Sequence, residues 1–412
     1  MLVTPWAPYP FDGGSKRIWS LCRLLRERFR FTLLTFASRP QDARAAADDL
    51  LREHRYLRPV FERVLWVDRR GDPENAEAGL PEDVRRFASP AMESALRAAL
   101  DSEKPDLVHV EYDLMAPYGR LVSRLPTVLT QHDVGTISFF QSYFREMAGW
   151  RKFGQVLPWV RRVAFERRAM RWFNRIIVMT EPDAHRLARI APAQRIRVAP
   201  TGVDLSHFDA PRAAPVAPTI VFIGHYPHYP NEDAVLYFAR EMLPRIRAAR
   251  PDVRFLVVGS SPTPAVVALG RQPGVIVTGT VEDVKPFLAQ AVVFVAPLRM
   301  GQGIKGKILE AFAMGVPVVA TSRAADGLDA CAGRDLIVAD RPAAFAAEVL
   351  ALLGDATRAG ALGEAGREAA RRGYDWTRLA GRLGAVYDEL IGAAVGIGAA
   401  APRARLAPEE AA

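Results

Sequence analysis

A segment in the second half of the chain brings glycines and lysines together at a spacing that suits a phosphate group. The residues VVFVAPLRMGQGIKGKILEAFAMGVPVVAT (292–321) have the pattern of a strand, a glycine-rich turn, a helix and a second strand. Gly301 and Gly303 allow a tight turn with exposed backbone N–H groups. The following helix begins at the same place, so its N-terminus favours a bound diphosphate. Lys305 and Lys307 add two full positive charges there.

The helix of this segment offers a carboxylate and has a clear end. Glu310 falls in its first turns, where the carboxylate could accept hydrogen bonds from the hydroxyls of a ribose. Gly315 is expected to end the helix, because glycine readily adopts the left-handed conformation found after a helix C-terminus. Phosphate ligands followed by a ribose acceptor indicate a nucleoside diphosphate site.

A second group of candidate residues lies in the first half of the chain. His132 directly follows TVLTQ, at the C-terminal end of an expected strand, and open α/β sheets bind ligands at that edge. Gly13 and Gly14 form either a simple turn after the first strand or a loop for phosphate groups. Glu111, just past DLVHV, fits a structural role as well as a site role. Asp133 could cap a helix as readily as take part in catalysis.

These residues would be positioned by two series of short apolar runs that alternate with longer helical stretches, the pattern of parallel α/β domains. Only Met1–Val3 are available for a first strand, so either that strand is unusually short or the start omits a few residues. Further strands of the first series are expected at 31–36, 106–110, 127–130, 175–180 and 196–202, with helices at 15–29 and 90–100. Strands of the second series are expected at 219–224, 254–259, 275–279, 292–298 and 317–321, with helices near 231–249 and 373–391.

A Pro/Ala-rich stretch, HFDAPRAAPVAPT, separates the two series and has the composition of a linker. We therefore predict an N-terminal Rossmann-like domain over 1–205, a linker over 206–218 and a C-terminal Rossmann-like domain over 219–375. A helix over 376–392 should cross back to the first domain. The low-complexity tail 393–412 is expected to be disordered.

The bulk properties are those of a soluble globular protein. The chain has 412 residues, half of them hydrophobic and a quarter charged, which suffices for two ordinary cores. It has neither the long apolar run of a membrane-spanning helix nor an N-terminal secretory signal, so a cytoplasmic location is expected. Cys22 and Cys331 are too few for a disulfide framework or a metal cluster, and no motif for a protein-bound metal is present.

Much of the net charge of +9 is concentrated in one segment. Residues 151–175 contain eight basic residues against a single glutamate, Glu166, with tryptophans and phenylalanines between them. Such a segment either lies on an anionic membrane surface or forms a solvated helix whose arginines flank a buried stripe. No nucleic-acid-binding module accompanies the charge, so nucleic acid is not an expected partner.

The glycine-rich segment resembles a known family. Its run G-x-G-x-K-x-K-x-x-E-A-x-A-x-G-x-P-V-V is similar to the donor-binding segment of retaining GT-B glycosyltransferases of family 4. Further similar landmarks, spread over nearly the whole chain, are Gly13-Gly14, PDLVHVEY, TVLTQHD, RIIVMTEPDAHRL, PTGVD and GYDW. The resemblance implies a GT-B fold: an acceptor-binding and a donor-binding Rossmann-like domain, a cleft between them and a C-terminal helix that crosses back.

The resemblance also implies a reaction and a set of residues for it. A sugar would pass from a nucleoside diphosphate sugar to an acceptor hydroxyl, with retention of anomeric configuration and without a metal or other cofactor. The acceptor would be a saccharide or, as the basic aromatic segment 151–175 suggests, a lipid-linked saccharide at the inner membrane face, in cell-surface polysaccharide or glycolipid assembly. His132, Lys305 and Lys307 would be catalytic. The donor would bind Gly13, Gly14, Gly224, His225, Gly301, Gln302, Gly303, Ile304 and Glu310.

Two positions depart from the family pattern. The family has two glutamates eight residues apart, whereas this chain has Gln302 and Glu310, so the first carboxylate's contact with the donor sugar passes to an amide or is lost. The usual G-R-…-K-G after the first strand of the second domain is absent, and Gly224, His225 and Asn231 stand in that region. The charge for the leaving diphosphate must then come mainly from the two lysines, with Arg299 as a further candidate.

Other functions fit parts of the sequence. GQGIKG (301–306) matches the dinucleotide fingerprint G-x-G-x-x-G, with Asp326 beyond it, but two lysines bracket its last glycine, where a NAD site needs none. A sugar-nucleotide epimerase shares the fold and would need further acids in the cleft. A non-catalytic nucleotide-binding protein would result if Gln302 had ended catalysis.

Overall fold

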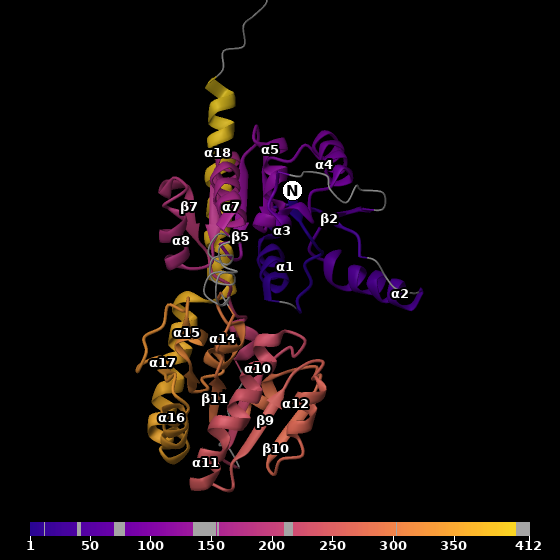
Figure 1. The fold of residues 1–412 in the computed structure, drawn as a ribbon. Helices are drawn as coiled ribbons and strands as arrows, with labels where there is room; N and C mark the ends of the chain where they lie inside the picture. The colour runs from indigo at the N-terminus through magenta and orange to yellow at the C-terminus, as the bar shows by residue number, and fades with distance from the viewer. Residues whose placement is uncertain are drawn as a thin grey trace, which may run out of the picture. The chain divides into compact units, whose positions relative to one another are not determined.

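The chain divides into two compact units (Figure 1). The first unit comprises Met1–Val178 and Ala184–Arg197, together with the chain from Ala380 onward. The second comprises Met179–Asp183 and Val198–Leu379. Each unit is built around its own sheet, so each is an α/β domain. The structure, a computed structural model, describes residues 1–11, 13–38, 43–69, 79–134, 154, 156–209, 217–301 and 303–400.

The first unit contains a seven-stranded sheet in the order β3-β2-β1-β4-β5-β6-β7. The pairs from β3 through β6 are parallel. Because β1 lies between β2 and β4, the strand order reverses there, and residues beyond the carboxyl ends of β1 and β4 meet at one edge. The strands are β1 (Leu2–Thr4), β2 (Thr32–Phe36), β3 (Arg63–Val67), β4 (Val108–Glu111), β5 (Thr127–Gln131), β6 (Arg175–Val178) and β7 (Ile196–Val198).

The helices of the first unit include α1 (Gly13–Leu25), which follows β1. It buries Ile18, Cys22 and Leu25, which lie one turn apart on a single face. The other helical elements between β2 and β7 are α2 (Ala43–Arg52), the π-helical η1 (Glu53–Leu57), α3 (Glu82–Arg85), α4 (Pro90–Glu103), η2 (Asp113–Tyr118), α5 (Gly119–Val122), α7 (Val156–Ala169), η5 (Met170–Trp172), α8 (Glu181–Leu187) and η6 (Ala193–Arg195).

The second unit repeats the arrangement with six parallel strands in the order β10-β9-β8-β11-β12-β13. Here β8 lies between β9 and β11, so the order reverses at β8. All five residues of β8 are buried, as expected for a central strand covered on both faces. The strands are β8 (Thr219–Ile223), β9 (Arg254–Val258), β10 (Val275–Gly279), β11 (Val293–Ala296), β12 (Val318–Ala320) and β13 (Ile337–Val338).

The helix that follows β8 is longer than one regular element. It runs through α10 (Tyr229–Tyr237), the π-helical η7 (Phe238–Met242) and α11 (Leu243–Ala249). Pro244 lacks a backbone N–H and therefore interrupts the regular ladder at this point. The other helices of the unit are α9 (Leu205–Phe208), α12 (Pro264–Leu269), α13 (Lys285–Ala289), α14 (Gly306–Ala313), α15 (Ser322–Ala325), α16 (Pro342–Gly354) and α17 (Ala356–Gly373).

The end of α14 agrees with the sequence prediction. Gly315 has φ +62°, and its N–H donates a bond of 2.8 Å to the carbonyl oxygen of Phe312. The next N–H, that of Val316, donates one of 2.9 Å to the carbonyl oxygen of Ala311. This pair of bonds is the Schellman motif, which requires the left-handed residue that glycine supplies.

The last helix, α18 (Trp376–Ala400), contributes to both units, because its first residues belong to the second unit and those from Ala380 onward to the first. It continues through 393–400, into the first residues of the predicted tail, where alanines favour helix. The rest of that tail, 401–412, lies outside the described residues. So do residues 210–216 of the predicted linker.

Candidate functional site

In the second unit, the glycine-rich turn follows β11, which pairs with β8 where the strand order reverses. Gly301 has φ +97° and Gly303 has φ +70°. Side chains rarely adopt these backbone angles, so both positions favour glycine, as the tight turn requires. The turn leads directly into α14, which begins at Gly306. Gln302 lies outside the described residues.

Two lysines flank the start of α14. Lys305 is buried, and its Nζ donates a hydrogen bond of 2.6 Å to the carbonyl oxygen of Gly303. The Nζ of Lys307 donates one of 2.6 Å to Oδ1 of Asn231 and lies 4.4 Å from the centroid of the Phe222 ring. Burial, and secondarily the charge of Lys305, lowers the pKa of Lys307 to about 7. A bound anion would raise the pKa of Lys307.

Asn231 connects Lys307 to the turn after β8. Its Nδ2 donates a hydrogen bond of 2.8 Å to the carbonyl oxygen of His225, whose exposed ring has Nδ1 2.8 Å from Oγ of Ser260. Gly224 and Gly259 bring the turns after β8 and β9 into contact, since a Cβ at Gly259 would lie 1.8 Å from the carbonyl oxygen of Gly224. Gly259 was not predicted from the sequence, although, like Gly224, it directly follows an apolar strand.

The remaining charged residues of this region have different surroundings. Nε of Arg299 donates a hydrogen bond of 3.0 Å to Asp233, a second guanidinium nitrogen bonds the other carboxylate oxygen, and the guanidinium carbon lies 4.4 Å from the centroid of the Tyr237 ring. The charge of Arg299 is therefore paired within the protein. Glu310 is half-buried on α14, and Ile304 packs partly buried against the core of the unit.

In the first unit, Gly13 and Gly14 form the first turn of α1 rather than a separate loop. A Cβ at Gly14 would lie 2.1 Å from Oη of Tyr112 and 3.2 Å from Nδ1 of His132, so packing requires glycine there. At Gly13, by contrast, no other described atom lies within 4 Å of the Cβ position. Packing therefore accounts for the second glycine, whereas the first faces open space within the described structure.

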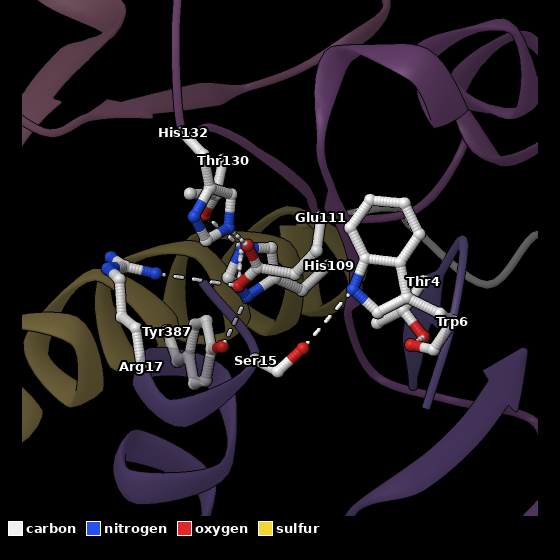
Figure 2. Close-up of polar contacts among 9 residues, drawn as sticks. All are labelled: Thr4, Trp6, Ser15, Arg17, His109, Glu111, Thr130, His132 and Tyr387. Carbon is white, nitrogen blue, oxygen red and sulfur yellow. Dashed lines mark hydrogen bonds and ion pairs between the residues drawn. The ribbon is translucent and has the colours of Figure 1, made fainter. Parts of the chain in front are cut away.

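His132 lies directly after β5 and stacks on Tyr112, with ring centroids 4.0 Å apart and an interplanar angle of 14°. The Tyr112 ring also contacts Trp6, with the two rings tilted at 53° and their centroids 4.7 Å apart. Nε1 of Trp6 donates a hydrogen bond of 3.2 Å to Oγ of Ser15 (Figure 2). Tyr112 has φ +70°, which is uncommon for a side chain of this size. These three rings form an aromatic wall at the carboxyl edge of the sheet.

The edge of the His132 ring meets a buried carboxylate. Nε2 of His132 lies 2.8 Å from Oε2 of Glu111, the last residue of β4 (Figure 2). Oε1 of Glu111 lies 3.4 Å from Nε2 of His109 and 3.7 Å from a guanidinium nitrogen of Arg17. Burial alone would raise the pKa of Glu111, but the hydrogen bond with His132 and the nearby charge of Arg17 hold it below its usual range. The carboxylate is therefore ionised at neutral pH.

Sequence reasoning found part of this cluster. It placed His132 and Gly14 as candidates, and the structure brings them together. It left Glu111 open and did not find His109, although the alternation in VHVE places both on the same side of β4. Tyr112 directly follows Glu111 in PDLVHVEY, whereas Arg17 and Tyr387 come from α1 and α18, and no local spacing could indicate them.

The basic segment predicted over 151–175 separates into buried and exposed residues. Arg162 on α7 is buried and forms ion pairs with Asp113, with Asp83 at 2.8 Å and with Glu166 at 3.7 Å. The arginines that remain exposed are Arg161, Arg167, Arg168 and Arg171. Within the described ranges, no helix has the length and apolar character to cross a membrane.

Both units have the strand order of a doubly wound, Rossmann-like sheet, with polar groups beyond the strand ends where that order reverses. Two such domains in one chain, with a final helix that contributes to both, define the GT-B fold. A family model described as Glycosyltransferase Family 4 matches residues 11–207, and one described as Glycosyl transferases group 1 matches residues 217–355. The chain therefore belongs to the GT-B glycosyltransferases of the family 4 type.

Solved structures share the fold at low sequence identity. Sucrose-phosphate synthase from Thermosynechococcus elongatus is 18% identical with a TM-score of 0.67, over 95% of this chain and 99% of that one. HepE from Anabaena in complex with UDP is 14% identical with a TM-score of 0.67, over 94% and 99%. A glycosyltransferase from Rickettsia africae is 12% identical with a TM-score of 0.63, over 95% and 98%. A search of curated proteins finds no match.

Proposed function

We propose that this glycosyltransferase moves a sugar from a nucleoside diphosphate sugar to an acceptor hydroxyl, with retention of anomeric configuration and without a metal or other cofactor. The observation that carries the proposal is the glycine turn that leads into α14 beside Lys305 and Lys307, at the reversal point of the second sheet. Backbone N–H groups and both lysines would hold the diphosphate, and Glu310 the ribose. HepE structures with UDP and UDP-glucose make uridine nucleotides the first donors to test.

In this reaction the bond between the anomeric carbon and the diphosphate breaks, and negative charge develops on the departing phosphate. An incoming diphosphate favours the protonated form of Lys307, so the amine gains its charge next to the leaving group. The acceptor oxygen bonds to the same face of the sugar, and its proton passes to the departing phosphate. His132 would position the sugar, and Gly13 and Gly14 would admit the donor phosphates.

The donor is tested by a thermal-shift panel with UDP, GDP, ADP and their common sugar derivatives. We expect one nucleoside diphosphate to stabilise the protein and Glu310→Ala to lose that stabilisation. Glu282→Ala, which changes an exposed glutamate of the same unit, is the matched control and should keep it. Stabilisation by NAD or NADP, with none by these nucleotides, would contradict the proposal and assign the glycine turn to a dinucleotide.

Retention is tested on the product, and metal independence is tested by turnover in the presence of EDTA. NMR of the new glycosidic bond should show the anomeric configuration of the donor, and turnover should persist in EDTA. A product with inverted configuration would contradict retention. Loss of turnover in EDTA that a divalent cation restores would contradict metal independence.

We further propose that α7 binds the cytoplasmic, anionic face of a membrane, where a lipid-linked saccharide would be the acceptor in cell-surface polysaccharide or glycolipid assembly. Val156, Leu157 and Val160 at the start of this helix are 42%, 57% and 48% exposed. Arg161 and Arg168 follow on the exposed side. Apolar side chains next to arginines form the kind of surface that binds anionic lipid.

Co-sedimentation with anionic vesicles at low salt tests this surface. We expect the protein to bind vesicles that contain phosphatidylglycerol, and the double variant Arg161→Glu with Arg168→Glu to lose that binding. Arg240→Glu with Arg271→Glu makes the same change of charge at two other exposed arginines and should bind normally. If the wild-type protein does not bind these vesicles, the membrane proposal is contradicted, and the proposed donor site is unaffected.

A further inference from the structure

We propose that Glu111 is a positioning residue for His132. Its carboxylate holds the imidazole in the tautomer with the proton on Nε2, which leaves Nδ1 beside Gly14 as a hydrogen-bond acceptor. A sugar hydroxyl suits this acceptor, because a hydroxyl can donate to it whereas an ionised phosphate oxygen cannot. The identity of this ligand rests on the proposed sugar transfer, and the tautomer does not.

The contact follows from the register of two neighbouring strands. β4 pairs with β5 so that Glu111 lies opposite Thr130, and His132 comes two residues later, beyond the end of β5. Figure 2 shows the carboxylate and the imidazole pointing toward each other, with Oε2 and Nε2 2.8 Å apart. The Glu111 side chain is 2% exposed and that of His132 10%, so water competes little for this bond.

The charge of Glu111 sets the direction of the hydrogen bond. A fully buried guanidinium, that of Arg17 on α1, lies 3.7 Å from Oε1 and favours the ionised carboxyl group. An ionised carboxylate can only accept hydrogen bonds. Nε2 of His132 must therefore donate, and a neutral imidazole with its proton on Nε2 keeps a lone pair on Nδ1.

His109 adds no positive charge beside the Glu111 carboxylate. Its Nδ1 lies 2.6 Å from the hydroxyl of Tyr387 and its Nε2 2.6 Å from that of Thr130. Burial lowers the pKa of His109 to about 4, so the ring is neutral at neutral pH and brings no second positive charge to the carboxylate. The two hydroxyls satisfy both ring nitrogens whichever of them carries the proton.

The ring plane of His132 is fixed as well. Tyr112 covers one face at a centroid distance of 4.0 Å, which opposes rotation out of the plane. Nδ1 then lies on the side of Gly14, 3.2 Å from the position that a Cβ there would take. A methyl group at that position would therefore crowd the acceptor. The tautomer and the orientation together present one lone pair at the start of α1.

The first test measures the tautomer directly and needs no substrate. In the full chain labelled with 15N-histidine, long-range proton–nitrogen correlations report which ring nitrogen carries the proton. The His132 signals are those lost in His132→Gln. We expect the proton on Nε2 near neutral pH. A proton on Nδ1 would overturn the proposal, whatever the enzyme transfers.

The second test asks whether the contact matters for turnover or only for packing. In Glu111→Gln the shape remains and the charge is lost. We expect kcat to fall about 10- to 100-fold, the range seen when partners that orient metal-bound histidines are removed. The thermal shift with UDP, which lacks the transferred sugar, should stay near wild type. The melting temperature itself should fall, because the buried Arg17 loses a charged partner.

The matched control is Glu103→Gln, which alters another ion-paired carboxylate of the first unit, one that pairs with Arg63. It should leave kcat unchanged. A folded Glu111→Gln enzyme with wild-type kcat would contradict the positioning role. If the wild type transfers no sugar at all, the proposed function fails, and the NMR result alone decides the tautomer.

Discussion

At Lys307, burial and the charge of a bound ligand have opposite effects on the pKa of the amine. In the free protein its amine bonds Asn231, and its pKa is about 7. A bound diphosphate favours the protonated amine, so binding takes up a proton when the free amine is neutral. We expect the affinity for UDP to fall as the pH rises from about 6 to about 8, because fewer molecules then carry a charged Lys307. Calorimetry in buffers of different ionisation enthalpy measures this uptake.

The comparison variants separate Lys307 from other groups that titrate in the same range. Lys307→Gln should bind UDP more weakly and lose most of the proton uptake. Lys285→Gln, which alters a lysine of the same unit that pairs with Asp283, should keep both. Equal proton uptake by wild type and Lys307→Gln would show that this amine is charged before the nucleotide binds.

Gly13 and Gly14 are neighbours that should respond differently to the same substitution. A methyl group at Gly14 would meet the Tyr112 hydroxyl at 2.1 Å, so Gly14→Ala should cost about 1–3 kcal/mol and displace the wall that holds His132. Gly13→Ala adds a methyl group to open space and should change stability by less than about 1 kcal/mol. We expect Gly13→Ala to keep its melting temperature and to raise the KM for the donor. An unchanged KM would remove Gly13 from the donor site.

At the scale of elements, the sequence predicts best where strands are buried on both faces. The strands β2, β5, β8 and β9 are rich in apolar and β-branched residues and almost entirely buried, and the structure places strands there. β3 was missed although Val64–Val67 form an apolar run of four, and in the structure its residues are mostly exposed or half-buried. β13 has only two residues. Lys307 and Asn231 were both noted, but their hydrogen bond depends on how α10 and α14 pack, which no spacing along the chain reveals.

The helix α7 shows why a count of arginines does not define a surface. Arg162 is buried among three carboxylates, and its removal takes a buried positive charge away from Asp113 and Glu166. We expect Arg162→Met to cost about 3–5 kcal/mol of stability, as for other broken buried ion pairs. Arg161→Met, one residue away and exposed, should stay within about 0.5 kcal/mol of wild type. Thermal unfolding of both variants measures the difference, and equal losses would contradict the buried role of Arg162.

At the scale of the whole molecule, the same strand order occurs twice, and each sheet brings its site residues together at its own reversal point. The sequence indicated candidate residues in both units, because His132 directly follows β5, whereas the glycines and lysines lie at the starts of α1 and α14. It predicted a final helix that crosses back to the first domain but not the contacts of α18, which join residues far apart in the chain. Tyr387 bonds His109, and Asp388 lies 2.6 Å from Arg28. The final helix is therefore part of the first unit's core and supports the Glu111 cluster.

Shortening the chain tests this role of α18. A chain that ends at Leu379 loses the buried Leu383 and Leu390 as well as Tyr387, each of which contributes about 1.5–3 kcal/mol by burial. We expect the first unit of this chain to melt well below wild type, while UDP still stabilises the second unit through its own lysines. A chain that ends at Ile391 keeps all three side chains and should melt like wild type. Scanning calorimetry with and without UDP resolves the two transitions. If the chain ending at Leu379 melted as the wild type does, α18 would not be part of the first unit's core, and the bond between Tyr387 and His109 would not support the Glu111 cluster.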